Sequence, residues 1–522
     1  MNVVIQPDRV VQTALVASLL CLGATAPVNA QDPLELMDQA VQSERRGDME
    51  AALGFYDQVV SQFPDDEQAP VALLRVAEER LATGAAELAV EAVTRLREDY
   101  GDAPSAAGAY VLDGVMQLAA ATGPDDLREA WNTFGNVVAR FERSRYPEAR
   151  WRREARMRRG HVAVLLGDLD LAAAEFLAII EDEPLGDQTA EAQFELATVL
   201  LYQGRWNEAA EILQRVVDRA SVETASDALT GTSRAARRRL SLLHRMVLRP
   251  AVGMTPWTQV RRLQLPTEAR EPIGVAASSD GRLLVADDRA DLALLFSASG
   301  ELVGRSAEQD LRLPWWGIDG EPYVLSRRAV VRPFGPASGP GSANAAGSVT
   351  FAVTDGGGVD RLDDLRAGAR SSFGEWVILD RDRRQVVRFD RDGRYRATVV
   401  DRIRDQSIVD LDVDARGRLW LLDGEQNHVL RFGFDGTAEG LRVSHDWRRS
   451  EALAVDSLGN VYVLDREAKT VDVFGPDGAA IHSVGPVLSD GTELRRPRDL
   501  AVDGSGRLYI VDGDPAAVLI LE

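Results

Sequence analysis

The C-terminal half of the chain repeats one arrangement of short apolar strands, and this repeat constrains the fold more than any other feature. Each copy holds an apolar strand, a turn, a second apolar strand that ends in Asp, and a third strand that ends in Phe or Leu. The second-strand residues are Asp287, Asp380, Asp423, Asp465 and Asp512, so the last three intervals are 43, 42 and 47 residues. The first interval is 93 residues and leaves room for one more copy. Repeats of this length, made of short strands, predict four-stranded sheets stacked around an axis.

The clearest copies share short runs of residues, namely Leu453–Asp456, Tyr462–Asp465 and Val473–Phe474, with Asn427-His428 and Arg431-Phe432 in the preceding copy. These runs resemble the NHL family of six-bladed β-propellers over about residues 257–522. The resemblance implies six blades. The copy missing from the spacing is expected at 317–335, where Ser326 replaces the recurrent Asp.

The last copy ends after its third strand, whereas an isolated strand, Trp257–Pro266, precedes the first copy. Pairing that strand with the last blade would close the ring and remove both open edges. A Gly-, Ala- and Ser-rich segment interrupts the second blade, and we expect a mobile loop at about 336–348. The following segment, 348–355, is interpreted as the outer hairpin of that blade. The propeller domain is predicted over 251–522.

The N-terminal half follows a helical period, with Ala-rich helix pairs anchored at Ala52, Ala89, Ala130, Ala172 and Ala209. The anchors are 37, 41, 42 and 37 residues apart. The copies resemble tetratricopeptide repeats, with hallmark residues at Gly47, Ala52, Tyr56 and Pro64, and again at Gly160, Gly167, Ala172, Phe176 and Pro184. The resemblance implies an α-solenoid with a concave groove, predicted over 31–250 and closed by a helix at 233–248.

In that family the first helix of each pair lines the groove. The matching positions are candidate partner-binding residues: Met37, Glu44, Arg45, Glu78, Met157, His161, Phe194 and Tyr202. The alternative is that these side chains pack between neighbouring repeats. An arginine-rich run, 143–159, is either a docking patch for an anionic partner or a solvated helix face paired with nearby acids. In the propeller, Trp315 and Trp316 are candidates for a carbohydrate-stacking platform, against a role in core packing.

The charge balance excludes some partners. The chain has 82 acidic and 60 basic residues, a formal net charge of −22. Such a surface repels nucleic-acid phosphates and anionic lipid. We therefore expect a protein or peptide partner and no nucleic acid.

The N-terminus has the pattern of an export signal. An apolar stretch runs from Val10 to Ala26, and Val28 and Ala30 satisfy the small-residue positions of a cleavage site. We expect cleavage after Ala30 and a periplasmic or extracellular chain without a transmembrane segment. Cys21, the only cysteine, lies inside this signal, so the mature chain would hold no thiol.

Catalytic residues cannot be assigned from the sequence. The propeller histidines, His428, His445 and His482, occupy different blade positions, so they are not expected to converge. The run from Asp410 to Asp414 lacks the Gly and Glu of a calcium-binding loop. The recurrent Asp residues are explained as turn residues that bind backbone N–H groups. We expect no catalytic residue, cofactor or metal, and interpret the protein as a non-enzymatic scaffold. The alternatives are a propeller hydrolase or lyase with a central metal, or a carbohydrate- or cell-wall-binding module.

Overall fold

The computed structural model describes residues 32–141, 150–182, 187–221, 226–248, 256–317, 320–331, 334, 349–355, 358–362, 364–371, 374–401, 403 and 407–522. The chain forms two compact units, and the division falls inside one helix. The first unit extends to residue 162, and the second runs from 163 to 522 and takes in residues 122–124. The predicted signal sequence and its cleavage site at Ala30, and the predicted mobile loop at 336–348, lie outside the described residues.

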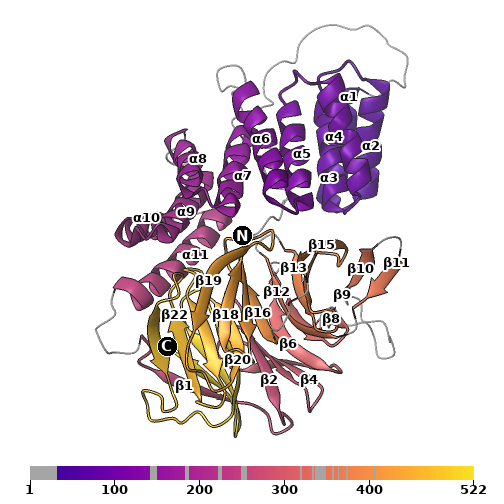
Figure 1. Ribbon diagram of the computed structural model, residues 1–522. Helices are drawn as coiled ribbons and strands as arrows, with labels where there is room; N and C mark the ends of the chain where they lie inside the picture. Colours follow the sequence, from indigo (N-terminus) through magenta and orange to yellow (C-terminus); the bar gives the residue numbers. More distant parts are fainter. Residues whose placement is uncertain are drawn as a thin grey trace, which may run out of the picture. The chain divides into compact units, whose positions relative to one another are not determined.

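Helices make up most of the described chain between residues 33 and 248 and are coloured indigo to magenta in Figure 1. They are α1 (Pro33–Arg46), α2 (Met49–Gln62), α3 (Ala69–Ala82), α4 (Ala86–Asp99), α5 (Ala106–Ala120), α6 (Pro124–Arg140), α7 (Arg150–Leu166), α8 (Leu169–Asp182), α9 (Asp187–Tyr202), α10 (Trp206–Arg219) and α11 (Asp227–Leu243), which continues as a short π-helical turn, η1 (His244–Leu248).

Local sequence explains how the helices pair. Asp32 caps α1 by accepting a hydrogen bond from the Leu34 backbone N–H at 3.2 Å. Gly47 then ends α1 with a φ of 78°, a left-handed conformation that glycine adopts without steric cost. The five predicted anchor alanines are all at most 1% exposed. A methyl group at each of these positions lets two helices approach closely, as the repeat pattern predicted.

The regular elements of the described chain from residue 260 onward are strands. They are β1 (Val260–Gln264), β2 (Pro272–Ala277), β3 (Leu283–Asp287), β4 (Leu292–Phe296), β5 (Leu302–Ala307), β6 (Leu311–Trp316), β7 (Pro322–Ser326), β8 (Ala329–Val331), β9 (Val349–Thr350), β10 (Ala352–Asp355), β11 (Gly358–Arg361), β12 (Leu365–Arg370), β13 (Trp376–Asp380), β14 (Gln385–Phe389), β15 (Tyr395–Val400), β16 (Ile408–Val413), β17 (Leu419–Asp423), β18 (His428–Phe432), β19 (Ala438–Ser444), β20 (Ser450–Val455), β21 (Val461–Asp465), β22 (Thr470–Phe474), β23 (Ala480–Val484), β24 (Pro497–Val502), β25 (Leu508–Gly513) and β26 (Ala516–Leu521).

These strands form six four-stranded antiparallel sheets, as the repeat predicted. Blades 1 to 5 are β2–β5, β6–β9, β12–β15, β16–β19 and β20–β23, and blade 6 is β24–β26 with β1. The first strand of each blade contacts the first strand of the next, and β24 contacts β2. The six inner strands therefore surround the propeller axis, and the apolar layers between neighbouring blades form the core.

The predicted ring closure is confirmed. Strand β1 pairs with β26 in an antiparallel ladder from Val260↔Leu521 to Gln264↔Ala517. The indole N–H of Trp257 adds a hydrogen bond to the Gly506 carbonyl at 2.7 Å. Figure 1 shows β1 beside the yellow C-terminal strands. Blade 6 thus takes its outer strand from the start of the propeller, and the closed ring leaves neither end as an open edge.

Blade 2 bears out one expectation and corrects another. Ser326 ends β7, and its Oγ accepts a hydrogen bond from the Ala329 N–H at 3.1 Å, so it replaces the missing Asp in the turn after the second strand. The sequence predicts that the segment 348–355 forms the outer hairpin of this blade, and the structure corrects this prediction. Only β9 joins the sheet, because Phe351 turns into the core and is 1% exposed. Beyond it, β10 pairs with β11 in a separate hairpin.

Candidate functional site

The recurrent second-strand aspartates are structural. Asp287 is fully buried, and its Oδ2 accepts hydrogen bonds from the backbone N–H groups of Arg270 and Glu271 at 2.7 and 2.8 Å. Asp512 accepts equivalent bonds from Arg495 and Arg496 at 2.9 and 2.8 Å. Each carboxylate thereby fixes the segment that enters the inner strand of its own blade. The prediction that these residues bind backbone N–H groups is confirmed.

A β-bulge recurs at the start of every inner strand. The first inner-strand residue pairs with the recurrent Asp or with Ser326, and the register then shifts before the next pair. The second residue is left out of the ladder, and bulges re-aim such side chains. These six bulge residues are Ile273, Arg312, Arg366, Val409, Glu451 and Arg498. Because both the inner-strand starts and the second-strand ends lie at this end of the blades, we call it the mouth face.

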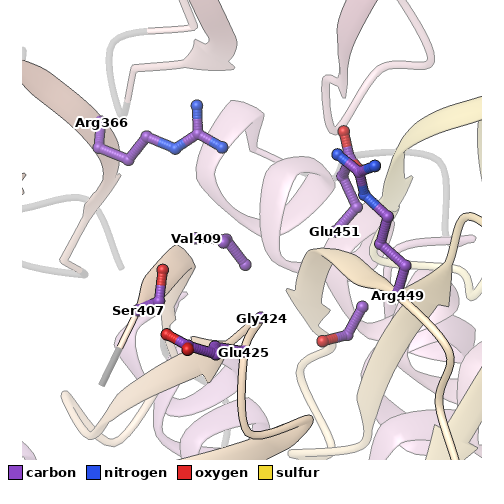
Figure 2. Close-up of a pocket in the computed structure, with 8 residues that line it drawn as sticks. Arg366, Ser407, Val409, Gly424, Glu425, Arg449 and Glu451 are labelled. Carbon is purple, nitrogen blue, oxygen red and sulfur yellow. The ribbon is translucent and has the colours of Figure 1, made fainter. Parts of the chain in front are cut away.

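A cavity of about 450 Å³ opens on the mouth face between blades 3, 4 and 5. Three bulge residues line it, Arg366, Val409 and Glu451, with further residues from the neighbouring turns: Ser407, Gly424, Glu425, Arg449 and Ser450. Figure 2 shows the Arg366 guanidinium reaching towards the cavity from one side, with Arg449 and Glu451 on the opposite side. The repeated bulge therefore builds the wall of the cavity.

The charged groups of the cavity differ in how they are held. Glu451 forms ion pairs with Arg449 at 3.2 Å and with Arg466 at 2.9 Å. Arg366 is half-buried, and among the described residues it has no hydrogen-bond or ion-pair partner. The Glu425 carboxylate also has no hydrogen-bond or ion-pair partner among the described residues. The Glu425 backbone N–H donates a hydrogen bond to the Asp423 carboxylate at 2.9 Å. One cation and one anion of the cavity are therefore available to a ligand.

The remainder of the mouth face also carries arginines. Arg498 forms an ion pair with Glu271 of blade 1. Burial, followed by the proximity of Arg466, lowers the pKa of the Arg498 guanidinium. Arg327 approaches Asp364 at 3.4 Å. Arg466 of blade 5 therefore lies close enough to Arg498 of blade 6 to influence its charge.

Buried carboxylates join the inner strands of different blades. Asp410 of β16 accepts a hydrogen bond from the Leu453 N–H of β20 at 2.8 Å. Asp499 of β24 accepts one from the Val275 N–H of β2 at 2.8 Å. Burial raises the pKa of Asp499 to about 7. The sequence pattern did not reveal this inter-blade role, although Asp410 and Asp499 occupy the same position, directly before an LDVD and an LAVD segment.

The propeller histidines lie in different structural settings. His428 is buried on β18, where its Nδ1 lies 3.0 Å from Nη2 of Arg442, and burial followed by Arg442 lowers its pKa. The His445 ring packs against Trp447, with 5.8 Å between centroids. His482 lies on β23. Among the described residues, no group of three or more His, Cys, Asp or Glu side chains is placed to hold a metal ion.

The candidate groove residues of the first helical unit differ in exposure. Arg45 is exposed and Met37 is half-buried. Glu44 is half-buried and accepts a hydrogen bond from the Tyr56 hydroxyl at 2.6 Å. Three others are buried: Glu78, Met157 and His161. Glu78 also forms an ion pair with Arg75 at 3.0 Å. Burial lowers the pKa of His161.

The remaining candidates lie in the second unit. Phe194 and Tyr202 of α9 are half-buried, and each ring is covered by an arginine, Arg239 at 5.3 Å and Arg416 at 5.6 Å. Trp315 packs on Trp376, with 5.4 Å between ring centroids. Trp316 lies under the Arg282 guanidinium at 4.5 Å and donates to the Ala276 carbonyl at 3.2 Å. Both tryptophans therefore contribute to packing within the propeller.

Comparison with known protein families supports the helical repeat architecture. The tetratricopeptide repeat family matches residues 191–221, which cover most of α9 and all of α10. No curated protein matches the sequence. Within the described residues, no helix is both long enough and apolar enough to cross a bilayer.

Solved propeller structures align with about half of the chain. A streptogramin B lyase matches with a TM-score of 0.38 and 10% identity, over 51% of this chain and 98% of its own. A virginiamycin B lyase from Staphylococcus aureus matches with a TM-score of 0.38 and 12% identity, over 51% and 99%. The WD40 β-propeller domain of Doa1 matches with a TM-score of 0.37 and 10% identity, over 51% and 98%. Similarity at this level carries no argument about activity. The chain combines a tetratricopeptide-like helical repeat region with a six-bladed β-propeller.

Proposed function

We propose that this protein is a non-enzymatic scaffold of the bacterial cell envelope, exported after cleavage at Ala30, that binds protein partners through both repeat arrays. The observation that carries the proposal is the joining of two repeat architectures in one chain. Helical solenoids present an extended concave surface, and propellers present the ends of their blades as a second one. Two such surfaces on one chain suit a protein that brings partners together.

Exposed apolar side chains on the helices support this role. Leu34 on α1 is 56% exposed and Val71 on α3 is 39% exposed. Both belong to first helices of neighbouring pairs, which line the groove in tetratricopeptide repeats. Single exposed apolar residues are common on protein surfaces. Where several lie together on a binding surface, a few of them contribute most of the affinity for the partner. We therefore propose that α1 and α3 contribute to a protein-binding surface.

In-cell crosslinking of the tagged full-length chain, followed by mass spectrometry, tests the proposal. We expect specific envelope proteins to be recovered, and their yield to fall at least several-fold in a Leu34→Glu, Val71→Glu double variant. Leu177→Glu is the matched control, because Leu177 is 43% exposed but lies on α8, the second helix of its pair. Recovery of no specific protein by the wild-type chain would contradict the scaffold function.

A further inference from the structure

The cavity on the mouth face has the chemistry of an anion site. Arg366 points towards it and has no partner in the described part of the chain. Ser407 and Ser450 also line it, but the Ser450 hydroxyl proton is already donated to Asn427, at 3.1 Å. The half-buried Arg366 guanidinium, whose N–H groups are unpaired in the described part of the chain, suits a planar anion that accepts two parallel hydrogen bonds.

The surroundings strengthen the attraction for anions. The six bulge residues comprise three arginines and one glutamate. The six residues that directly follow the recurrent Asp residues and Ser326 again comprise three arginines and one acid: Asp288, Arg327, Arg381, Gly424, Arg466 and Gly513. These two rings of positions are net positive in a chain whose formal net charge is −22, and ion pairs with Glu271 and Asp364 offset part of that positive charge. A local positive field on an acidic protein steers an anionic group to this face.

We propose that the cavity binds a carboxylate of a peptide segment from a protein partner, with Arg366 as the principal contact. The proposal rests on the proposed scaffold function and names the chemistry of one partner. Two glutamates in the wall, Glu425 and Glu451, oppose a dianionic group such as phosphate more strongly than a monoanionic carboxylate. Their oxygens can also accept hydrogen bonds from peptide N–H groups, which a peptide supplies beside its carboxylate.

The size of the cavity agrees with this ligand. A volume of about 450 Å³ lies within the usual range for small-molecule sites, roughly 300–1,000 Å³, and holds an acidic side chain with its adjoining backbone. Nucleic acid is disfavoured, because a long polyanion would extend beyond the positive rings onto an acidic chain.

Peptide binding by the full-length chain tests the proposal. The probes are fluorescent hexapeptides that contain Asp or Glu, the same peptides with Asn or Gln, and the same peptides with phosphoserine. Anisotropy titrations should give measurable binding of acidic peptides and at least tenfold weaker binding of the amide and phosphoserine forms. Arg366→Gln should lower the affinity for the acidic peptides at least tenfold. Arg366→Lys should give an intermediate affinity, because it keeps the charge but loses the planar fork.

Arg289→Gln is the matched control. Arg289 is an exposed arginine after the second strand of blade 1, across the ring from blade 4, and it lies outside the cavity. Its substitution makes the same change in net charge and should leave peptide affinity unchanged. Thermal melting should show that Arg366→Gln folds like the wild type, since Arg366 has no partner to lose.

Four results would overturn the proposal: no binding of any acidic peptide, equal binding by Arg366→Gln, equal loss in Arg289→Gln, or tighter binding of the phosphoserine peptides. The scaffold function is tested separately by crosslinking. If Arg366→Gln recovers the same envelope proteins as the wild type while peptide binding fails, the carboxylate site is wrong and the scaffold stands. If the wild type recovers no protein, the scaffold itself is wrong.

Discussion

At the scale of single residues, buried carboxyl groups that join the blades make the stability of the propeller depend on pH. Burial raises the pKa of Asp499 from 3.8 to about 7 in the folded chain. Between about pH 4 and pH 7 the folded state therefore holds a proton that the unfolded chain has released. Stability should fall as the pH rises through this window and level off above it.

We predict that Asp499→Asn makes this part of the pH profile less steep, while Asp412, whose pKa burial also raises to about 7, keeps part of the slope. The Asn side chain keeps an oxygen that can accept the Val275 N–H but cannot ionise. Urea unfolding at pH 5 and pH 8 should show a wild-type loss of about 1–3 kcal/mol and a clearly smaller loss in the variant. Asp477→Asn, at an exposed turn, is the control and should follow the wild type. A wild-type propeller that becomes more stable between pH 5 and pH 8 would refute this assignment.

A pair of glycines tests close packing between blades. Gly436 has a φ of 81°, and a Cβ there would overlap the Val399 carbonyl oxygen of blade 3. Gly440 has a φ of 71°, with open space around the Cβ position. Both alanine variants meet the left-handed strain of about 1–2 kcal/mol, but only Gly436→Ala must also displace backbone. Its midpoint of thermal unfolding should fall well below that of Gly440→Ala, and equal midpoints would show that the blades adapt.

At the scale of elements, the β1–β26 ladder should dominate the stability of the propeller. We predict that a shortened chain beginning at Glu268 melts far below one beginning at Ala251, or aggregates. Loss of β1 leaves the backbone groups of β26 unpaired and exposes an edge strand. The cost should exceed the roughly 1 kcal/mol of a typical point substitution. Two chains that both stay monomeric and melt at the same temperature would contradict this role for β1.

The elements also show why the sequence revealed so much of the fold and so little of the site. The second-strand residues and the anchor alanines recur at fixed positions, so periodicity alone located the blades and the helix pairs. The cavity residues do not recur: Arg366, Val409 and Glu451 share one bulge position but differ in chemistry. Bulges depend on register between strands, which the sequence does not state. The burial of Phe351 could not be predicted for a similar reason, because it depends on packing against blade 3.

At the scale of the whole molecule, the last helices belong to the same compact unit as the propeller. The Tyr462 hydroxyl lies 3.9 Å from the Met246 sulfur. A Cβ at Gly506 would meet Leu242 and Arg245. The predicted domain boundary at residue 250 would separate these groups, so it stays a prediction that needs a direct test.

We predict that a chain beginning at Asp168 has a higher melting temperature than one beginning at Ala251. The longer chain keeps α8 to α11, and with them the apolar contacts of Leu242 and Met246. Differential scanning calorimetry should show a single transition for the longer chain. Two separate transitions, with the propeller melting at the same temperature in both chains, would favour the boundary at 250.

The closing ladder has a kinetic consequence. Val260 and Leu521 pair across about 260 positions of the chain, whereas other blades form from strands that follow one another. Contacts between residues so distant in sequence form slowly, because the intervening chain must first be brought together. We therefore expect five blades to assemble before the sixth acquires its outer strand. In native-state hydrogen exchange, the amides of β1 should become exchangeable together, in one opening event that releases the ring while the remaining blades keep their protection.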